Sequence, residues 1–95
     1  MKKNILKISQ TEINKLKFKK KDVLESDKAK KERIKKLKIA VMQKKKKGGT
    51  VSLIIETAKR GLFRIDSLIL MAGRDFIMLA GGETIPVKAI KKIKL

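Results

Sequence analysis

The chain has 95 residues and a formal charge of +18, because 27 Lys and Arg residues outweigh 9 Asp and Glu residues. The absence of cysteine excludes disulfides and thiolate chemistry, and the absence of histidine removes the usual general base and the commonest metal ligand. This composition predicts a non-enzymatic protein, with no cofactor and no metal site, whose partner is polyanionic.

The apolar segments of the chain are short. The most apolar one, Leu62 to Ala72, contains Arg64 and Asp66 and falls short of the roughly 20 residues that span a bilayer. Near the N-terminus, Lys7 interrupts the apolar run that follows the first two lysines, which is not typical of a secretory signal. We therefore expect a soluble, cytoplasmic protein with no integral membrane association.

The positive charge lies mostly in the first half of the chain. Residues 1–47 carry a net charge of +14 and residues 48–95 a net charge of +4, and the composition changes at Gly48-Gly49. This change divides the chain into a basic helical arm, residues 1–47, and a small β-barrel domain, residues 48–95.

The first half has a helical pattern. Ser9 and Glu12 have the spacing of a capping box, in which each side chain satisfies a free backbone N–H of the other. Farther on, apolar residues recur at intervals of three and four, and acidic residues precede them where a helix dipole favours anions. One helix is expected from about residue 27 to 46, and whether residues 10–22 join it is left open.

The second half changes to an apolar period of two, which indicates strands. We expect strands at 51–57, 62–71, 76–80, 83–87 and 90–95, with tight turns at Gly61 and at Gly81-Gly82. The apolar phase shifts within 62–71, which predicts a bend or bulge. Pro86 restricts the fourth strand to an edge or a strand end, and Lys88-Ala89 forms one helical turn.

This order of elements resembles the Sm-like small β-barrels, including the Hfq type and small Sm-like proteins of Firmicutes, some of them associated with spore coats. Residues 71–79 (MAGRDFIML) and 86–93 (PVKAIKKI) carry the resemblance, which covers about residues 49–95. It implies an α+β fold: a five-stranded, strongly bent antiparallel β-barrel preceded by the basic N-terminal helical arm. It also implies that Lys88 lies near a central pore and that Phe76 lies near an inner RNA site.

Lysine clusters are the strongest functional feature of the sequence. Lysines that neutralise phosphates release counterions, and lysine favours point-charge contacts over bidentate reading of bases. The alternative is a solvated helix face without a ligand. The candidate nucleic-acid-binding residues are Lys28, Lys31, Lys35, Lys38, Lys44, Lys45, Lys46 and Lys47 in the arm, and Arg74, Phe76 and Lys88 in the barrel.

The aromatic and methionine side chains have competing interpretations. Phe63 and Phe76 lie within apolar alternation, so core packing is favoured over base stacking for both, by a larger margin for Phe63. Met42, Met71 and Met78 are expected to fill gaps in the core.

These observations favour a nucleic-acid-binding protein, with RNA preferred over DNA and with little sequence specificity. The alternative is a structural or assembly protein, such as a spore-coat component, which self-associates through barrel edge strands and binds an acidic protein. A membrane-surface protein ranks third, because residues 27–46 offer only a narrow aliphatic stripe.

Overall fold

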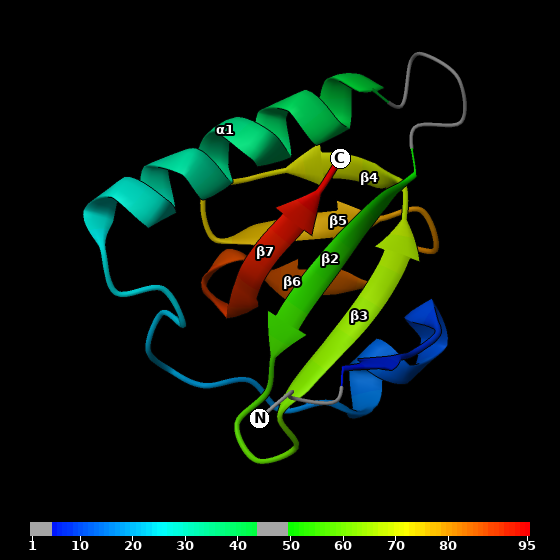
Figure 1. The fold of residues 1–95 in the computed structure, drawn as a ribbon. Coiled ribbons are helices and arrows are strands. Elements are labelled where there is room, and N and C mark those ends of the chain that lie inside the picture. The colour runs from blue at the N-terminus through cyan, green and yellow to red at the C-terminus, as the bar shows by residue number, and fades with distance from the viewer. Residues whose placement is uncertain (1–4, 44–49) are drawn as a thin grey trace.

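The computed structural model describes residues 5–43 and 50–95, which form one α-helix, two 3₁₀ helices and seven strands (Figure 1). In chain order the elements are β1 (Leu6–Lys7), η1 (Gln10–Lys15), α1 (Asp27–Gln43), β2 (Val51–Glu56), β3 (Leu62–Ser67), β4 (Ile69–Ala72), β5 (Phe76–Leu79), β6 (Thr84–Pro86), η2 (Val87–Ala89) and β7 (Ile90–Lys94).

The strands form two sheets. In the first sheet the order is β1-β3-β2-β7, with β2 antiparallel to both β3 and β7 and with the short β1 parallel to β3. The second sheet has the order β4-β5-β6 and is antiparallel throughout. Helix α1 packs against β4 and β7, one strand from each sheet (Figure 1).

The prediction of a closed five-stranded barrel is wrong. Over the described residues the strands stay in two separate sheets, because the expected long second strand is interrupted at Leu68. The carbonyl of Leu68 accepts hydrogen bonds from the Ser67 hydroxyl, at 3.0 Å, and from the Ala80 N–H, at 3.1 Å. The bend is therefore a break between β3 and β4, and each half pairs with a different neighbour.

The prediction of an N-terminal helical arm is also wrong. Helix α1 comes third in chain order, after β1 and η1, and an extended connection, residues 16–26, that we call the strap, leads into it. Its start at Asp27 agrees with the expected helix, and the Ser26 hydroxyl caps it by accepting a hydrogen bond from the Ala29 N–H at 3.0 Å. The Ser9 and Glu12 pair begins only the short 3₁₀ helix η1.

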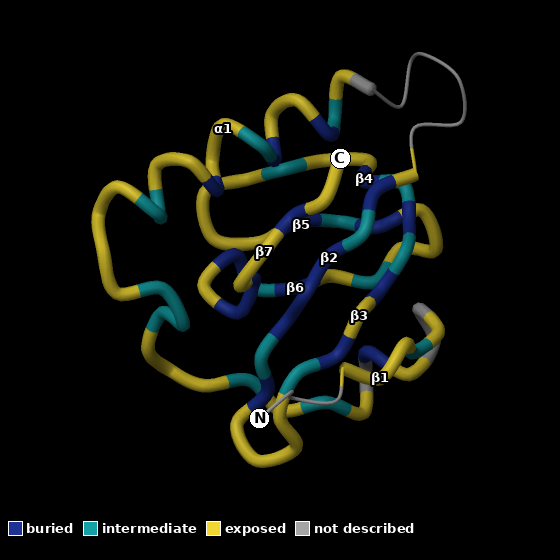
Figure 2. The backbone as a smooth tube through the Cα atoms, in the orientation of Figure 1, coloured by how far each residue is buried: buried dark blue, intermediate teal, exposed yellow. Residues whose placement is uncertain are grey.

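One hydrophobic core joins both halves of the chain. Ile13 of η1 and Leu37 and Ala40 of α1 are buried in the same cluster as the inward-facing residues of both sheets. Figure 2 shows this burial along the strands and on the inner side of α1. Burying each large aliphatic side chain contributes roughly 1.5–3 kcal/mol, so the N-terminal segment and the helix add directly to the stability of the sheets.

The turns agree with the sequence pattern. Gly61 and Gly82 adopt positive φ angles of 80° and 91°, which a residue with a Cβ rarely adopts. Pro86 ends β6, an edge strand, and the helical turn η2 precedes the last strand as expected. Within the described part of the chain, no helix is both long and apolar enough to cross a membrane.

Burial of the aromatic and methionine residues departs from expectation. Phe63 is buried, as predicted, but the side chains of Phe76, Met71 and Met42 are 55%, 61% and 68% exposed. The expected core role is therefore wrong for these three residues. Phe76 and Met71 lie on the outer face of the second sheet. Strand alternation buries Ile77 beside Phe76, and a register shift between Ile69 and Met71 leaves Met71 exposed although Ile69, two residues before it, is buried.

Candidate nucleic-acid interface

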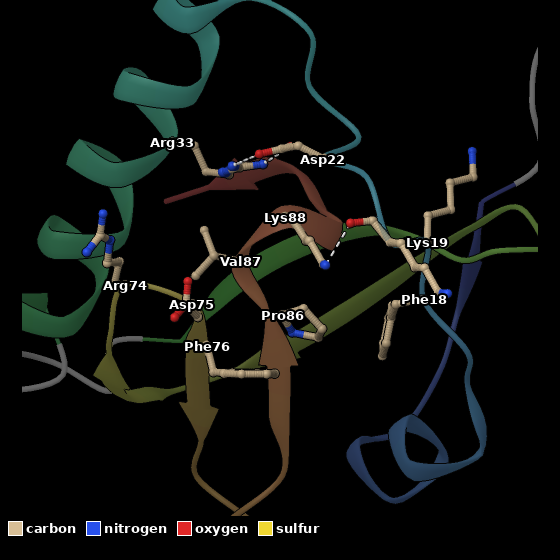
Figure 3. A pocket seen from close by; sticks show the side chains of 11 residues that line it. Phe18, Lys19, Asp22, Arg33, Arg74, Asp75, Phe76, Pro86, Val87 and Lys88 are labelled. Carbon is tan, nitrogen blue, oxygen red and sulfur yellow. Dashed lines mark hydrogen bonds and ion pairs between the residues drawn. The ribbon is translucent and has the colours of Figure 1, made fainter.

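A pocket of about 560 Å³ opens between the strap, helix α1 and the second sheet. We call it the strap pocket (Figure 3). One wall comes from the strap, another from the β4–β5 turn, and a third from the end of β6 and η2. The residues that line it are Phe18, Lys19, Lys20, Asp22, Arg33, Arg74, Asp75, Phe76, Pro86, Val87 and Lys88.

A bidentate ion pair fixes the strap to the helix. Arg33 donates from Nη1 to Asp22 Oδ1 at 2.8 Å and from Nη2 to Asp22 Oδ2 at 2.6 Å. The Arg33 guanidinium also donates to the Ile90 carbonyl at 3.0 Å, and the residue is only 6% exposed. The hydrogen bond from Arg33 holds the pKa of Asp22 below its ordinary value.

Lys88 attaches the strap to η2. Its Nζ donates to the Lys20 carbonyl at 2.7 Å, and its own carbonyl accepts from the Val23 N–H at 2.9 Å. An ammonium carries three N–H donors, so this arrangement leaves Lys88 with donors for a ligand. On the opposite side, the Val87 N–H donates to the Asp75 carbonyl at 2.8 Å and ties η2 to the β4–β5 turn.

Two phenylalanine rings and a proline ring form the apolar part of the strap pocket. Figure 3 shows Phe76, Pro86 and Phe18 on one side and the Asp22–Arg33 pair on the other. Phe76 and Pro86 are cross-strand partners in β5 and β6, and Phe18 is half-buried where the strap bridges to Thr57. An exposed phenyl ring beside ammonium and guanidinium groups suits a flat, anionic ligand such as a nucleotide.

The outer face of α1 carries a row of exposed lysines. Residues 28, 31, 35 and 38 recur at intervals of three and four, which places them on one side of an α-helix over about 15 Å. Within the described part of the chain none of them forms an ion pair. We call Lys28, Lys31, Lys35 and Lys38 the lysine stripe.

The acidic residues that form ion pairs lie away from this stripe. Hydrogen bonds from Lys19 to Glu56 and from Arg64 to Asp66 hold the pKa values of both carboxyls below their usual range. These two carboxylates lie on β2 and β3 of the first sheet. Among the described residues, the ion pairs are Asp22 with Arg33, Glu56 with Lys19 and Lys91, and Asp66 with Lys7 and Arg64.

Arg74 connects the stripe to the strap pocket. A second, smaller pocket of about 290 Å³ lies between α1 and β4, and both Lys38 of the stripe and Arg74 line it. Because Arg74 also lines the strap pocket, basic side chains continue from the outer face of the helix to Phe76. The strap pocket also contains the carboxylates of Asp22, which pairs with Arg33, and of Asp75.

The candidate residues therefore fall into three groups. Arg74, Phe76 and Lys88 meet in the strap pocket, and Lys28, Lys31, Lys35 and Lys38 form the stripe. Lys44, Lys45, Lys46 and Lys47 lie outside the described residues. Sequence reasoning missed Phe18 and Lys20 of the strap as pocket residues, although a lone phenylalanine within the basic run 17–21 is a signal for such a site.

No group of three or more metal-binding side chains occurs among residues 5–43 and 50–95. Comparison of the chain with protein families, with curated proteins and with solved structures found no match. The resemblance to Sm-like proteins thus stays a prediction from two short stretches of sequence.

The Asp22–Arg33 pair makes stability depend on acid pH. Because the pKa of Asp22 is lowered in the folded state, the stabilisation is complete above the unfolded value of about 3.9 and is lost as the pH falls through the folded value. The Asp22→Asn variant leaves a buried guanidinium without its counter-charge, which costs about 3 kcal/mol of unfolding free energy at neutral pH.

Urea denaturation followed by circular dichroism measures this cost. We expect the difference between Asp22→Asn and the parent protein to be largest above about pH 5 and to shrink below about pH 4. Asp75→Asn is the matched control, since Asp75 lines the same pocket without an ion pair in the described chain; its effect should stay within about 0.5 kcal/mol. Equal losses in the two variants would contradict a specific role for the pair.

Proposed function

We propose that this protein is a non-enzymatic nucleic-acid-binding protein that prefers single-stranded RNA and binds it with little sequence specificity. One observation carries the proposal: Phe76, an exposed phenylalanine, lines the strap pocket together with Arg74 and Lys88, and Arg74 also lines the neighbouring pocket that includes Lys38 of the lysine stripe. The stripe contacts phosphates, and the strap pocket receives an unpaired base that stacks on Phe76.

The chemistry of the two surfaces supports this choice of ligand. Lysine ammonium groups neutralise phosphates as point charges and do not read base edges as arginine does, so sequence preference is weak. RNA is favoured because protein recognition of RNA concentrates on unpaired bases that are splayed out onto aromatic side chains. A cytoplasmic location is part of the same proposal, since the cysteine-free chain has no need of an oxidising compartment.

The first prediction concerns the lysine stripe. Changing Lys28, Lys31, Lys35 and Lys38 together to Gln removes up to four phosphate contacts, and each contact with a single strand contributes about 0.7 to the slope of log affinity against log salt. We expect the slope to fall by about 2–3 and the affinity for a short single-stranded RNA to fall correspondingly at low salt. Fluorescence anisotropy over a salt series measures both quantities.

The control for the stripe removes the same amount of charge elsewhere. Lys15, Lys17, Lys59 and Arg60 are exposed and lie outside the lining of the strap pocket and of the smaller pocket between α1 and β4. Their combined change to Gln should leave most of the slope intact, because the ligand does not contact them. If the two quadruple variants lose affinity equally, net charge alone drives binding and the stripe is not an interface.

The second prediction concerns Phe76. Replacing it with Ala removes a stacking platform worth about 1–3 kcal/mol per base, so affinity for single-stranded RNA should fall by about 5-fold to 150-fold. Phe76→Tyr keeps the ring and should retain affinity near that of the parent protein. Duplex DNA, whose bases stay stacked inside the helix, should show little change with either variant.

Met71→Ala is the matched control, because Met71 is similarly exposed on the same sheet but does not line the strap pocket. Titrations with all three variants use the same labelled RNA at one salt concentration. A loss in Met71→Ala as large as in Phe76→Ala, or no loss in either, would rule out base stacking in the pocket.

A further inference from the structure

The pocket between α1 and β4, which we call the α1–β4 groove, differs in chemistry from the strap pocket. Its walls are aliphatic side chains and small residues, with no aromatic ring and no carboxylate among them. Its volume of about 290 Å³ is roughly half that of the strap pocket. The residues that line it are Ile34, Leu37, Lys38, Ala72, Gly73, Arg74 and Val87.

The apolar character of this groove reaches the surface. Ile34 is 47% exposed although it lies next to the buried Leu37 side of the helix, so an apolar contact is available at the mouth of the groove. Lys38 and Arg74 supply the only charges in the lining, and neither forms an ion pair in the described chain. A ligand of this groove therefore needs an apolar group for Ile34 and Leu37 and negative charge for Lys38 and Arg74.

We infer that the α1–β4 groove binds an acidic peptide, which inserts one aliphatic side chain against Ile34 and Leu37 and places carboxylates on Lys38 and Arg74. Charge complementarity selects this occupant. A nucleobase lacks a ring to stack on in this groove, and a second copy of a chain with net charge +18 brings like charge to a cationic rim.

Arg74 lines both pockets, and Lys38 belongs to the stripe as well as to the groove, so the two ligands share two cations. A carboxylate held by Arg74 in the groove removes that guanidinium from a phosphate in the strap pocket. Acidic peptide and RNA then weaken the binding of each other. By thermodynamic linkage, the factor by which the peptide lowers RNA affinity equals the factor by which RNA lowers peptide affinity. An acidic protein partner would in this way release the nucleic acid.

The test uses a short labelled peptide in which one Leu is flanked by Asp and Glu residues, and a matched peptide with Ser in place of that Leu. We expect the Leu peptide to bind the full-length protein about tenfold more tightly than the Ser peptide, because only the Leu side chain is buried. The Ile34→Ser variant should lose most of this difference.

Ile39→Ser is the control variant, because Ile39 is on the same helix and 44% exposed but does not line the groove. Its peptide affinity should stay within about twofold of the parent protein. Thermal melts followed by circular dichroism show whether both variants fold. The change of Leu to Ser in the peptide tests the contact with Ile34 in the unmodified protein.

A competition titration tests the shared cations. The Leu peptide should raise the apparent Kd of single-stranded RNA, and with Ile34→Ser about tenfold more peptide should be needed for the same effect, while RNA affinity itself stays unchanged. Equal binding and equal competition by the two peptides would show that the peptide acts only as a polyanion on the stripe, and would overturn the inference while RNA binding stands. Binding that depends on Ile34 for anionic phosphatidylglycerol vesicles but not for the Leu peptide would assign the groove to lipid and overturn it as well.

Discussion

The rest of the structure depends on the ion pair between Asp22 and Arg33. The side chain of Arg33 on α1 is buried. Its guanidinium donates three hydrogen bonds, two to Asp22 of the strap and one to the carbonyl of Ile90 in β7. A buried guanidinium without such partners is strongly destabilising. The pair therefore sets the position of the strap against helix and sheet, and with it the shape of the strap pocket.

Charge is distributed unequally over the folded chain. Carboxylates on β2 and β3 neutralise lysines and arginines on the side of the first sheet, whereas the outer face of α1 and the strap pocket keep most of their cations free of ion pairs in the described residues. Exposed cations without an ion pair in the described residues also lie elsewhere, at Lys15, Lys17, Lys59 and Arg60, so charge alone does not single out the path from the stripe to the strap pocket. Phe76 adds a feature that charge alone does not provide, an exposed ring at the end of that path.

Local features of this fold follow from the sequence, and its long-range arrangement does not. The helix start at Asp27, most strand positions after residue 50, the glycine turns and η2 follow from the helix dipole, alternation and the φ requirements of single residues, whereas β1 was not expected. Whether the bend at Leu68 closes a barrel or divides two sheets depends on pairing between distant strands, which periodicity does not encode. The sequence predicts part of the strap pocket, namely Arg74, Phe76 and Lys88, but Phe18 joins them only through the path of the strap. The burial of Arg33 is predictable from the sequence, because Arg33 lies at the i, i+4, i+7 spacing with Leu37 and Ala40 on one side of α1.

The central claim is that the strap pocket and the lysine stripe form one continuous surface for a single strand. The most direct test is a ¹H–¹⁵N NMR titration of the full-length protein with a short single-stranded RNA at about 0.15 M salt, where weak surface attraction is screened. The account predicts that residues of the strap, the β4–β5 turn, η2 and α1 shift together with one affinity, while β1 and the β2–β3 turn stay unchanged. Shifts spread over lysines throughout the molecule, or confined to α1 with the pocket unaffected, would contradict it.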